Sequence, residues 1–229
     1  MALIQILLLA LSSAGYIGFI ALHSHGRPTL APFLYISFVV AFLYCFAIAR
    51  LLPLGATLCL ALGLVAGAWA LWQQRSDLPD RLSGLKLWHL LYIVPFAIFF
   101  FAIPSDFLFT EWDEFSFWAS SIKLISQTDA LYVADSATGF KHYPPGQQMF
   151  QYYLVYFAGW SEGTVLYAQI VFMLAGLLAV VGSLIRQSGV LELSAFWCAV
   201  IIVYLFGFDF AHILVDQLLA SKESELLEV

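Results

Sequence analysis

Long apolar segments that carry almost no charge constrain this chain more than any other feature of its sequence. A helix needs about 20 apolar residues to cross the hydrocarbon core of a bilayer. Six segments approach that length: residues 3–22, 32–49, 51–72, 87–103, 163–185 and 193–208. A seventh, 145–159, is shorter and has three glutamines near its start, which leaves either a tilted span or a re-entrant helix. The pattern predicts an all-α, polytopic transmembrane helical bundle with about seven membrane helices.

The composition of the 229 residues excludes several classes of protein. Hydrophobic residues make up 62% of the chain and charged residues only 10%, whereas soluble domains have about 25% charged residues. The formal net charge of −6 offers no basic surface for nucleic acid. A cytosolic enzyme, a nucleic-acid-binding protein and a disordered chain are therefore excluded.

The distribution of charge predicts an orientation. Residues 73–86 contain Arg75, Arg81 and Lys86, and positive loops stay on the cytoplasmic side of a membrane. Residues 105–144 are acidic and would then lie outside. We therefore divide the chain into a four-helix transmembrane region (1–104), an external loop (105–144), further transmembrane helices (145–220) and a polar tail (221–229).

The external loop contains an amphipathic pattern that predicts short interfacial helices. Apolar side chains recur there at helical spacing: Phe115, Trp118, Ile122 and Ile125. Asp113 and Glu114 stand in the first turn, where carboxylates favour the positive end of the helix dipole. We expect this helix to lie on the membrane surface, with Trp112 and Trp118 at headgroup depth. An interfacial linker whose acids only cap a helix would give the same pattern.

A basic and aromatic element precedes the next apolar segment. It reads Lys141-His142-Tyr143-Pro144-Pro145, and proline is tolerated in the first turn of the helix that follows. Cations held at this position could bind a phosphate or an anionic headgroup. Anchoring of the chain at the interface by its basic side chains is the alternative interpretation.

These motifs together resemble the type C superfamily of membrane glycosyltransferases, which take sugars from polyprenyl-phosphate carriers. The Asp113-Glu114 pair resembles the acidic pair of the family's first large external loop, and residues 141–145 resemble its Lys-Pro-Pro element. Residues 159–162, Gly-Trp-Ser-Glu, are similar to a Gly-x-Ser-Glu turn between the two helices that follow. Asp216, ahead of a leucine-rich run, resembles a later helix motif. The resemblance covers roughly residues 105–220.

The resemblance implies transfer of a sugar from a polyprenyl-phosphate donor to an envelope glycan, lipid or protein. Asp113 would be the general base, and Glu114 would orient the acceptor or hold a cation. Lys141, or His142 when protonated, would face the phosphate. The enzyme would sit in the inner (plasma) membrane of a bacterium, with its active loop on the external side.

Tyr143 and Asp216 complete the set of expected site residues. A divalent cation is a possible cofactor, although the sequence does not require one. Asp209, His212 and Asp216 share one helical face and could hold a metal or simply face water. Relatives in the superfamily have more helices, so the chain is expected to be a truncated member or to act with a partner subunit.

Two further function classes fit the same features. A transporter or flippase component for lipid-linked sugars would use interfacial aromatics and cations without any chemistry. A non-catalytic scaffold in envelope polysaccharide assembly would need only the membrane helices. Because the ionisable residues gather in one loop rather than along the spans, the pattern favours surface chemistry over transport.

Overall fold

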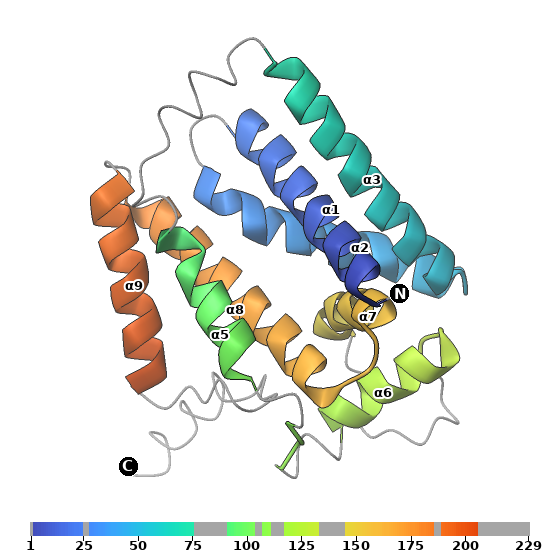
Figure 1. Cartoon of the computed structure of the whole chain (residues 1–229). Helices are drawn as coiled ribbons and strands as arrows, with labels where there is room; N and C mark the ends of the chain where they lie inside the picture. The colour runs from blue at the N-terminus through green and yellow to red at the C-terminus, as the bar shows by residue number, and fades with distance from the viewer. Residues whose placement is uncertain are drawn as a thin grey trace, which may run out of the picture.

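The computed structural model describes residues 2–24, 28–75, 91–103, 107–110, 117–132, 145–185 and 189–205. In these ranges all regular structure is helical, which confirms the predicted all-α bundle (Figure 1). A short 3-10 helix, η1, spans Pro28–Leu30. The α-helices are α1 (Ala2–His23), α2 (Ala31–Ile48), α3 (Leu52–Gln73), α5 (Val94–Ala102), α6 (Ala119–Thr128), α7 (Gly146–Ala158), α8 (Glu162–Leu184) and α9 (Gly189–Leu205).

Four of these helical stretches are long and apolar enough to cross a membrane. They are α1, η1 together with α2, α3 and α8, and they coincide with four of the predicted spans. The chain is therefore an integral membrane protein by the length and composition of its helices. Helices α5 and α9 are described over 9 and 17 residues respectively, which is less than a full span.

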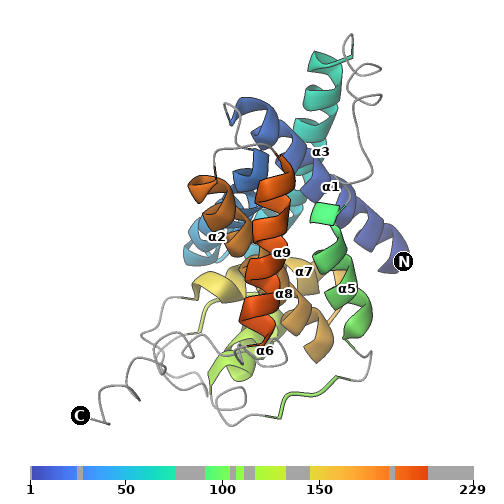
Figure 2. The same ribbon diagram turned by 90° about the vertical axis from the view of Figure 1, so that its left-hand side faces the viewer.

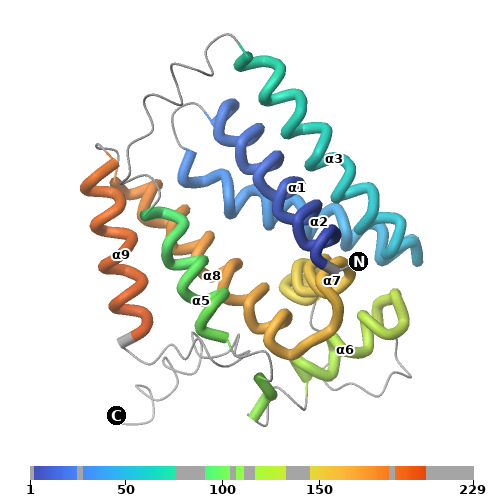
Figure 3. The backbone as a smooth tube through the Cα atoms, viewed as in Figure 1, coloured from blue at the N-terminus to red at the C-terminus, as the bar shows by residue number. Residues whose placement is uncertain are grey.

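The helices place two sets of chain segments at opposite ends of the bundle. We call the end of the bundle where α6 and α7 lie the loop end. The N-terminal ends of α1, α3 and α8 and the C-terminal end of α2 lie there too (Figures 1 and 3). Helix α3 ends at the other end of the bundle (Figure 1), and Arg75 follows its C-cap residue Gln74 in the sequence. The predicted orientation places the basic residues 73–86 and the acidic residues 105–144 on opposite sides of the membrane, and it therefore requires that the end of α3 and the loop end be far apart. The side of the membrane that each end faces remains a prediction.

Helices α1 and α3 pack together through glycine. A Cβ atom added at Gly15 of α1 would clash with the backbone carbonyl oxygen of Gly63 in α3, and one added at Gly67 would lie 2.9 Å from the Gly15 Cα. Gly63 and Gly67 are four residues apart, the small-residue spacing that lets membrane helices approach closely. The Ser12 hydroxyl donates to the Leu60 carbonyl oxygen across the same contact, at 2.9 Å. Backbone proximity, rather than large side chains, therefore holds these two spans together.

Helix α7 resolves the ambiguity left by the short apolar segment at 145–159. Its 13 residues rise about 20 Å at 1.5 Å per residue, well short of a hydrocarbon core of about 30 Å. It lies across the loop end, against α1, α2, α6 and α8 and, less extensively, α3 (Figures 1 and 2). Phe150, Tyr152 and Tyr153 are almost fully buried in these contacts. Helix α7 is thus a buried cross-brace and not a span.

Helices α5 and α9 pack at one side of α8 (Figure 1). The Tyr92 hydroxyl, just before α5, donates to the Gly189 carbonyl oxygen at 2.9 Å, and the Trp197 indole N–H of α9 donates to the Leu91 carbonyl oxygen at 3.2 Å. These two bonds join the start of α5 to α9.

Candidate functional site

The turn between α7 and α8 has a defined local structure that explains its Gly-Trp-Ser-Glu sequence. Gly159 has a φ of 91°, a conformation that side chains disfavour, so glycine fits this position. The Ser161 hydroxyl caps α8 by accepting the backbone N–H of Thr164 at 3.0 Å. Glu162 then occupies the first turn of α8, where a carboxylate suits the helix dipole.

Glu162 also fastens a distant part of the chain to α8. Its Oε2 atom accepts the backbone N–H of Phe109 at 2.5 Å, across 53 positions in sequence. The Phe109 side chain is itself buried, at 4% exposure, and meets Phe107 edge-to-face at 6.0 Å. Residues 107–110, at the beginning of the loop predicted to be external, are therefore held against the start of α8.

Helix α6 lies further along the same loop of residues 105–144. Ile122 and Ile125 lie in one helix, as their helical spacing predicted, and with Trp118 they are buried where α6 packs against α7. Trp118 is only 9% exposed, and its ring packs against Phe117 with ring centroids 4.5 Å apart; its depth in the membrane remains a prediction. The apolar face of α6 thus meets protein instead of lipid.

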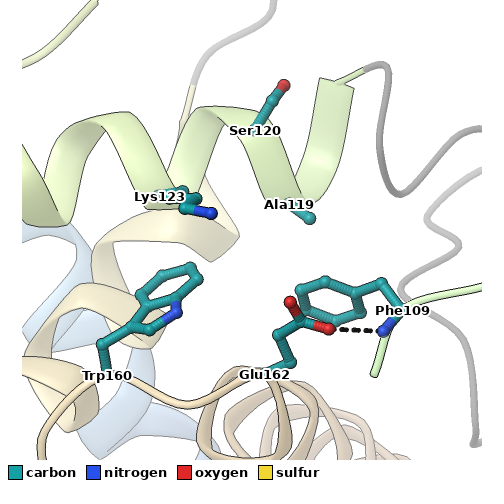
Figure 4. A pocket seen from close by; sticks show the side chains of 6 residues that line it. All are labelled: Phe109, Ala119, Ser120, Lys123, Trp160 and Glu162. Carbon is teal, nitrogen blue, oxygen red and sulfur yellow. Dashed lines mark hydrogen bonds between the residues drawn. The ribbon is translucent and has the colours of Figure 1, made fainter. Parts of the chain in front are cut away.

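A pocket lies between α6, residues 107–110 and the turn that leads into α8, as Figure 4 shows. Its volume is about 220 Å³, and its lining residues are Phe109, Ala119, Ser120, Lys123, Trp160 and Glu162. The Lys123 ammonium, the Trp160 indole and the second carboxylate oxygen of Glu162 face the same space, whereas the Ser120 hydroxyl points away from it (Figure 4). An acceptor, a donor and an aromatic face therefore converge on one small pocket.

The charges around this pocket are not neutralised by direct contact. In the part of the chain that the structure describes, the Lys123 ammonium forms no salt bridge. One carboxylate oxygen of Glu162 accepts the backbone N–H of Phe109. A site with both a cation and a carboxylate suits a ligand that donates and accepts hydrogen bonds, such as a polyhydroxylated ring. It suits a phosphate less well, because the carboxylate repels an anion.

A second polar contact ties α6 to α7. Asp129 ends α6 in the left-handed conformation, with a φ of 52°, which aspartate tolerates better than most residues. Its Oδ1 atom accepts the hydroxyl proton of Tyr152 in a 2.7 Å bond. This bond therefore ties the C-terminal end of α6 to α7.

Helix α7 also buries side-chain amides. Gln147 donates from Nε2 to the Gln169 Oε1 of α8 at 2.7 Å. Gln148 is 1% exposed, and within the described part of the chain neither its Nε2 nor its Oε1 has a hydrogen-bond partner. Burying an amide without a partner costs about 1–3 kcal/mol. The two neighbouring glutamines thus make opposite contributions to stability.

We expect Gln148→Met to raise the free energy of unfolding by about 1–3 kcal/mol, because it replaces an unpartnered buried amide with an apolar side chain of similar shape. Gln147→Met is the matched variant, and it should lower the same quantity by about 1 kcal/mol because it breaks the bond to Gln169. Reversible unfolding in detergent micelles measures both. A Gln148→Met variant less stable than the parent would contradict this account of the amide.

The residues singled out as the catalytic and phosphate-binding set lie outside the described residues. They are Asp113, Glu114, Lys141, His142, Tyr143 and Asp216. The Gly-Trp-Ser-Glu turn is described, and so is the helix that follows the acidic pair. Sequence reasoning assigned no role to Lys123, Trp160 or Phe109, although Trp160 belongs to a turn that it had singled out.

No protein-family model, curated protein or solved structure matches the chain. Within the described residues, no group of three or more His, Cys, Asp or Glu side chains could hold a metal ion. The possible divalent cation and the set formed by Asp209, His212 and Asp216 concern positions outside those residues.

Proposed function

We propose that this chain is a membrane glycosyltransferase that moves a sugar from a polyprenyl-phosphate donor to an acceptor hydroxyl at the loop end of the bundle. The order and spacing of the motifs between residues 105 and 220 support this proposal, since they resemble the type C superfamily. The proposal includes Asp113 as the general base and Lys141 with His142 as the cations that face the phosphate. It also includes a bacterial inner membrane with the loop end outside.

The structural feature that best supports the proposal is the pocket between α6, α8 and residues 107–110. Phe109 and Phe117 are both buried, and each stands four positions from Asp113 in the sequence. Four residues extend at most about 14 Å, so the length of the chain permits Asp113 to act at the pocket, and the proposal includes this role. A catalytic carboxylate would then act beside Lys123, Trp160 and Glu162.

The pocket has the size and chemistry of a site for one sugar ring. Its volume of about 220 Å³ falls below the roughly 300–1,000 Å³ of sites that bind drug-sized molecules. The Trp160 indole can cover the C–H face of a sugar, the Lys123 ammonium can donate to hydroxyl oxygens, and the free Glu162 oxygen can accept hydroxyl protons. These roles are part of the proposal.

The reaction needs one base and one anion-stabilising group. Asp113 would accept the proton of the acceptor hydroxyl while that oxygen forms a bond to the anomeric carbon of the donor. The bond between the anomeric carbon and the phosphate oxygen breaks, and its electron pair leaves with the polyprenyl phosphate. Lys141, with His142 when protonated, would stabilise the negative charge that gathers on this phosphate.

Transport of lipid-linked sugars is the alternative function that an experiment must distinguish from sugar transfer. A transport path commonly uses ionisable residues inside the spans. Helices α1, α2 and α3 contain no Asp, Glu, Lys or Arg, and α8 contains only Glu162 at its first position. This distribution favours chemistry at the loop end over passage through the bundle.

Transfer of a labelled sugar in proteoliposomes tests the proposal. The full chain is reconstituted and supplied with either a polyprenyl-phosphate sugar or a nucleotide sugar, together with an extracted pool of envelope acceptors. We expect labelled product only from the polyprenyl-phosphate donor. Transfer from the nucleotide sugar alone would overturn the assigned donor class.

Trp160→Ala tests the role of the pocket. Loss of an aromatic face costs about 1.4 kcal/mol, so the KM for the sugar substrate should rise about tenfold while kcat changes little. Trp69→Ala is the matched control, because Trp69 is an exposed tryptophan on α3 that lies outside the pocket. Equal effects of the two substitutions on KM would remove the pocket from the account.

A further inference from the structure

A second and larger hollow lies at the loop end, between the turn that joins α2 to α3 and the end of α6. Its volume is about 600 Å³. Most of its lining is apolar, and three polar side chains join it; the lining residues are Ala47, Ile48, Arg50, Leu124, Thr128, Ala130, Leu131 and Tyr132. We call this hollow the Arg50 groove. It is distinct from the Lys123 pocket, although α6 contributes a wall to each.

Arg50 occupies a backbone position that normally favours glycine. Its φ is 58°, and left-handed backbone costs a residue with a side chain about 1–2 kcal/mol. The Arg50 and Leu51 N–H groups donate to the carbonyl oxygens of Ala47 and Phe46, at 3.0 and 2.9 Å, and so close the C-terminus of α2. Glycine is the usual residue at this position of such a cap. A residue with a side chain at this strained position therefore favours the interpretation that the side chain of Arg50 has a function.

The Arg50 side chain is the one cation among the described residues that line the groove. Within the described residues it forms no salt bridge. The nearest described acid along α6, Asp129, is not part of the lining and is hydrogen-bonded by Tyr152. Burial raises the pKa of Tyr132 above its ordinary value, so its hydroxyl stays protonated. Among its described lining residues the groove thus has one guanidinium and two hydroxyl groups and no carboxylate.

The surroundings of the groove favour a ligand that is part anion and part hydrocarbon. Ile48 and Leu51 are 65% and 48% exposed at the ends of two helices of spanning length, where hydrocarbon chains would lie beside them. A guanidinium binds phosphate oxygens through paired N–H donors. Basic pockets between membrane helices hold lipid headgroups in this way.

We propose that the Arg50 groove binds the phosphate of a membrane lipid, with Arg50 as its cation and with Ile48 and Leu131 against the first part of the lipid chain. The lipid can be a phospholipid or a polyprenyl phosphate, since both join a phosphate to a long hydrocarbon. Free phosphate would leave the apolar walls without contact. This site stands whether or not the chain transfers sugars.

Lipid binding by the purified full chain in neutral detergent tests the proposal. The probes are farnesyl phosphate, phosphatidylglycerol, farnesol and inorganic phosphate, and native mass spectrometry measures the bound fraction over a titration. We expect at least one of the two lipid phosphates to bind about tenfold or more tightly than farnesol and inorganic phosphate. The tighter of the two identifies the source of the lipid. Equal binding of farnesol, or equal binding of inorganic phosphate, would overturn the proposal.

Arg50→Gly separates binding from folding. Glycine removes the cation and also relieves the left-handed strain, so this variant should be at least as stable as the parent. It should nevertheless bind the preferred lipid phosphate about tenfold more weakly, whereas Arg50→Lys should keep part of the affinity. Arg75→Ala, which removes a cation from the opposite end of the bundle, is the control and should bind as the parent does. An Arg50→Gly variant with unchanged affinity would contradict the role of Arg50.

Discussion

Asp113→Asn should lower sugar transfer by about 10²–10⁴-fold, because general-base help of this size is lost when a carboxylate becomes an amide. Asparagine keeps the shape of the side chain and can still form hydrogen bonds, but it cannot accept the proton of the acceptor hydroxyl. The effect should fall on kcat more than on KM, since the base acts in the transition state and not in ground-state binding. Initial rates of labelled sugar transfer in proteoliposomes measure it.

Asp135→Asn is the matched control for this substitution. Asp135 lies in the same acidic external loop but outside the motifs that resemble the glycosyltransferases, so its loss should leave the rate within about twofold. Equal thermal stability of both variants would show that the bundle is intact. If Asp113→Asn transfers sugar at the parent's rate, Asp113 is not the base.

Gly15→Val should destabilise the bundle by about 3 kcal/mol or more. The added side chain would meet the backbone carbonyl oxygen of Gly63, and backbone cannot swing away as the end of a side chain can. Forcing extra carbons into a well-packed contact usually costs about 1–3 kcal/mol, and a backbone clash lies at or beyond the upper end. The free energy of unfolding in detergent micelles is the measurement.

The same helix supplies the control for this prediction. A Cβ at Gly18 would meet nothing within 4 Å, so Gly18→Val should change the free energy of unfolding by about 0.5 kcal/mol or less. Both substitutions add the same atoms to the same helix, and only their contact with α3 differs. Similar losses for the two variants would mean that close α1–α3 packing does not hold the bundle together.

The spanning helices could be predicted from the sequence because length and apolarity alone decide them. Residues 3–22 and 51–72 became α1 and α3 with shifts of one residue or so at each end. Their mutual packing was not predicted, yet Gly63 and Gly67 carry a four-residue signal for close approach. The length of α7 could be predicted from the sequence, but its position across the loop end depends on contacts with five other helices, α1, α2, α3, α6 and α8.

The candidate site was only partly readable from the sequence. The Gly-Trp-Ser-Glu turn was recognised as a motif, and its glycine and serine act through local backbone geometry that a sequence can indicate. The bond from Phe109 to Glu162 joins residues 53 positions apart, and no local pattern encodes such a pairing. Helical spacing placed Ile122 and Ile125 on one face of α6, but it could not show that this face meets α7 rather than lipid.

Analysis of both products of a single reaction tests the central claim most directly. Proteoliposomes that contain the full chain receive a polyprenyl-phosphate sugar labelled on both the sugar and the lipid, together with the acceptor pool. We predict that glycosylated acceptor and free polyprenyl phosphate appear in equal amounts, because the bond between the anomeric carbon and the phosphate oxygen breaks once for each sugar transferred. Movement of the intact, doubly labelled lipid across the bilayer, without release of polyprenyl phosphate, would contradict the glycosyltransferase account and identify a transporter.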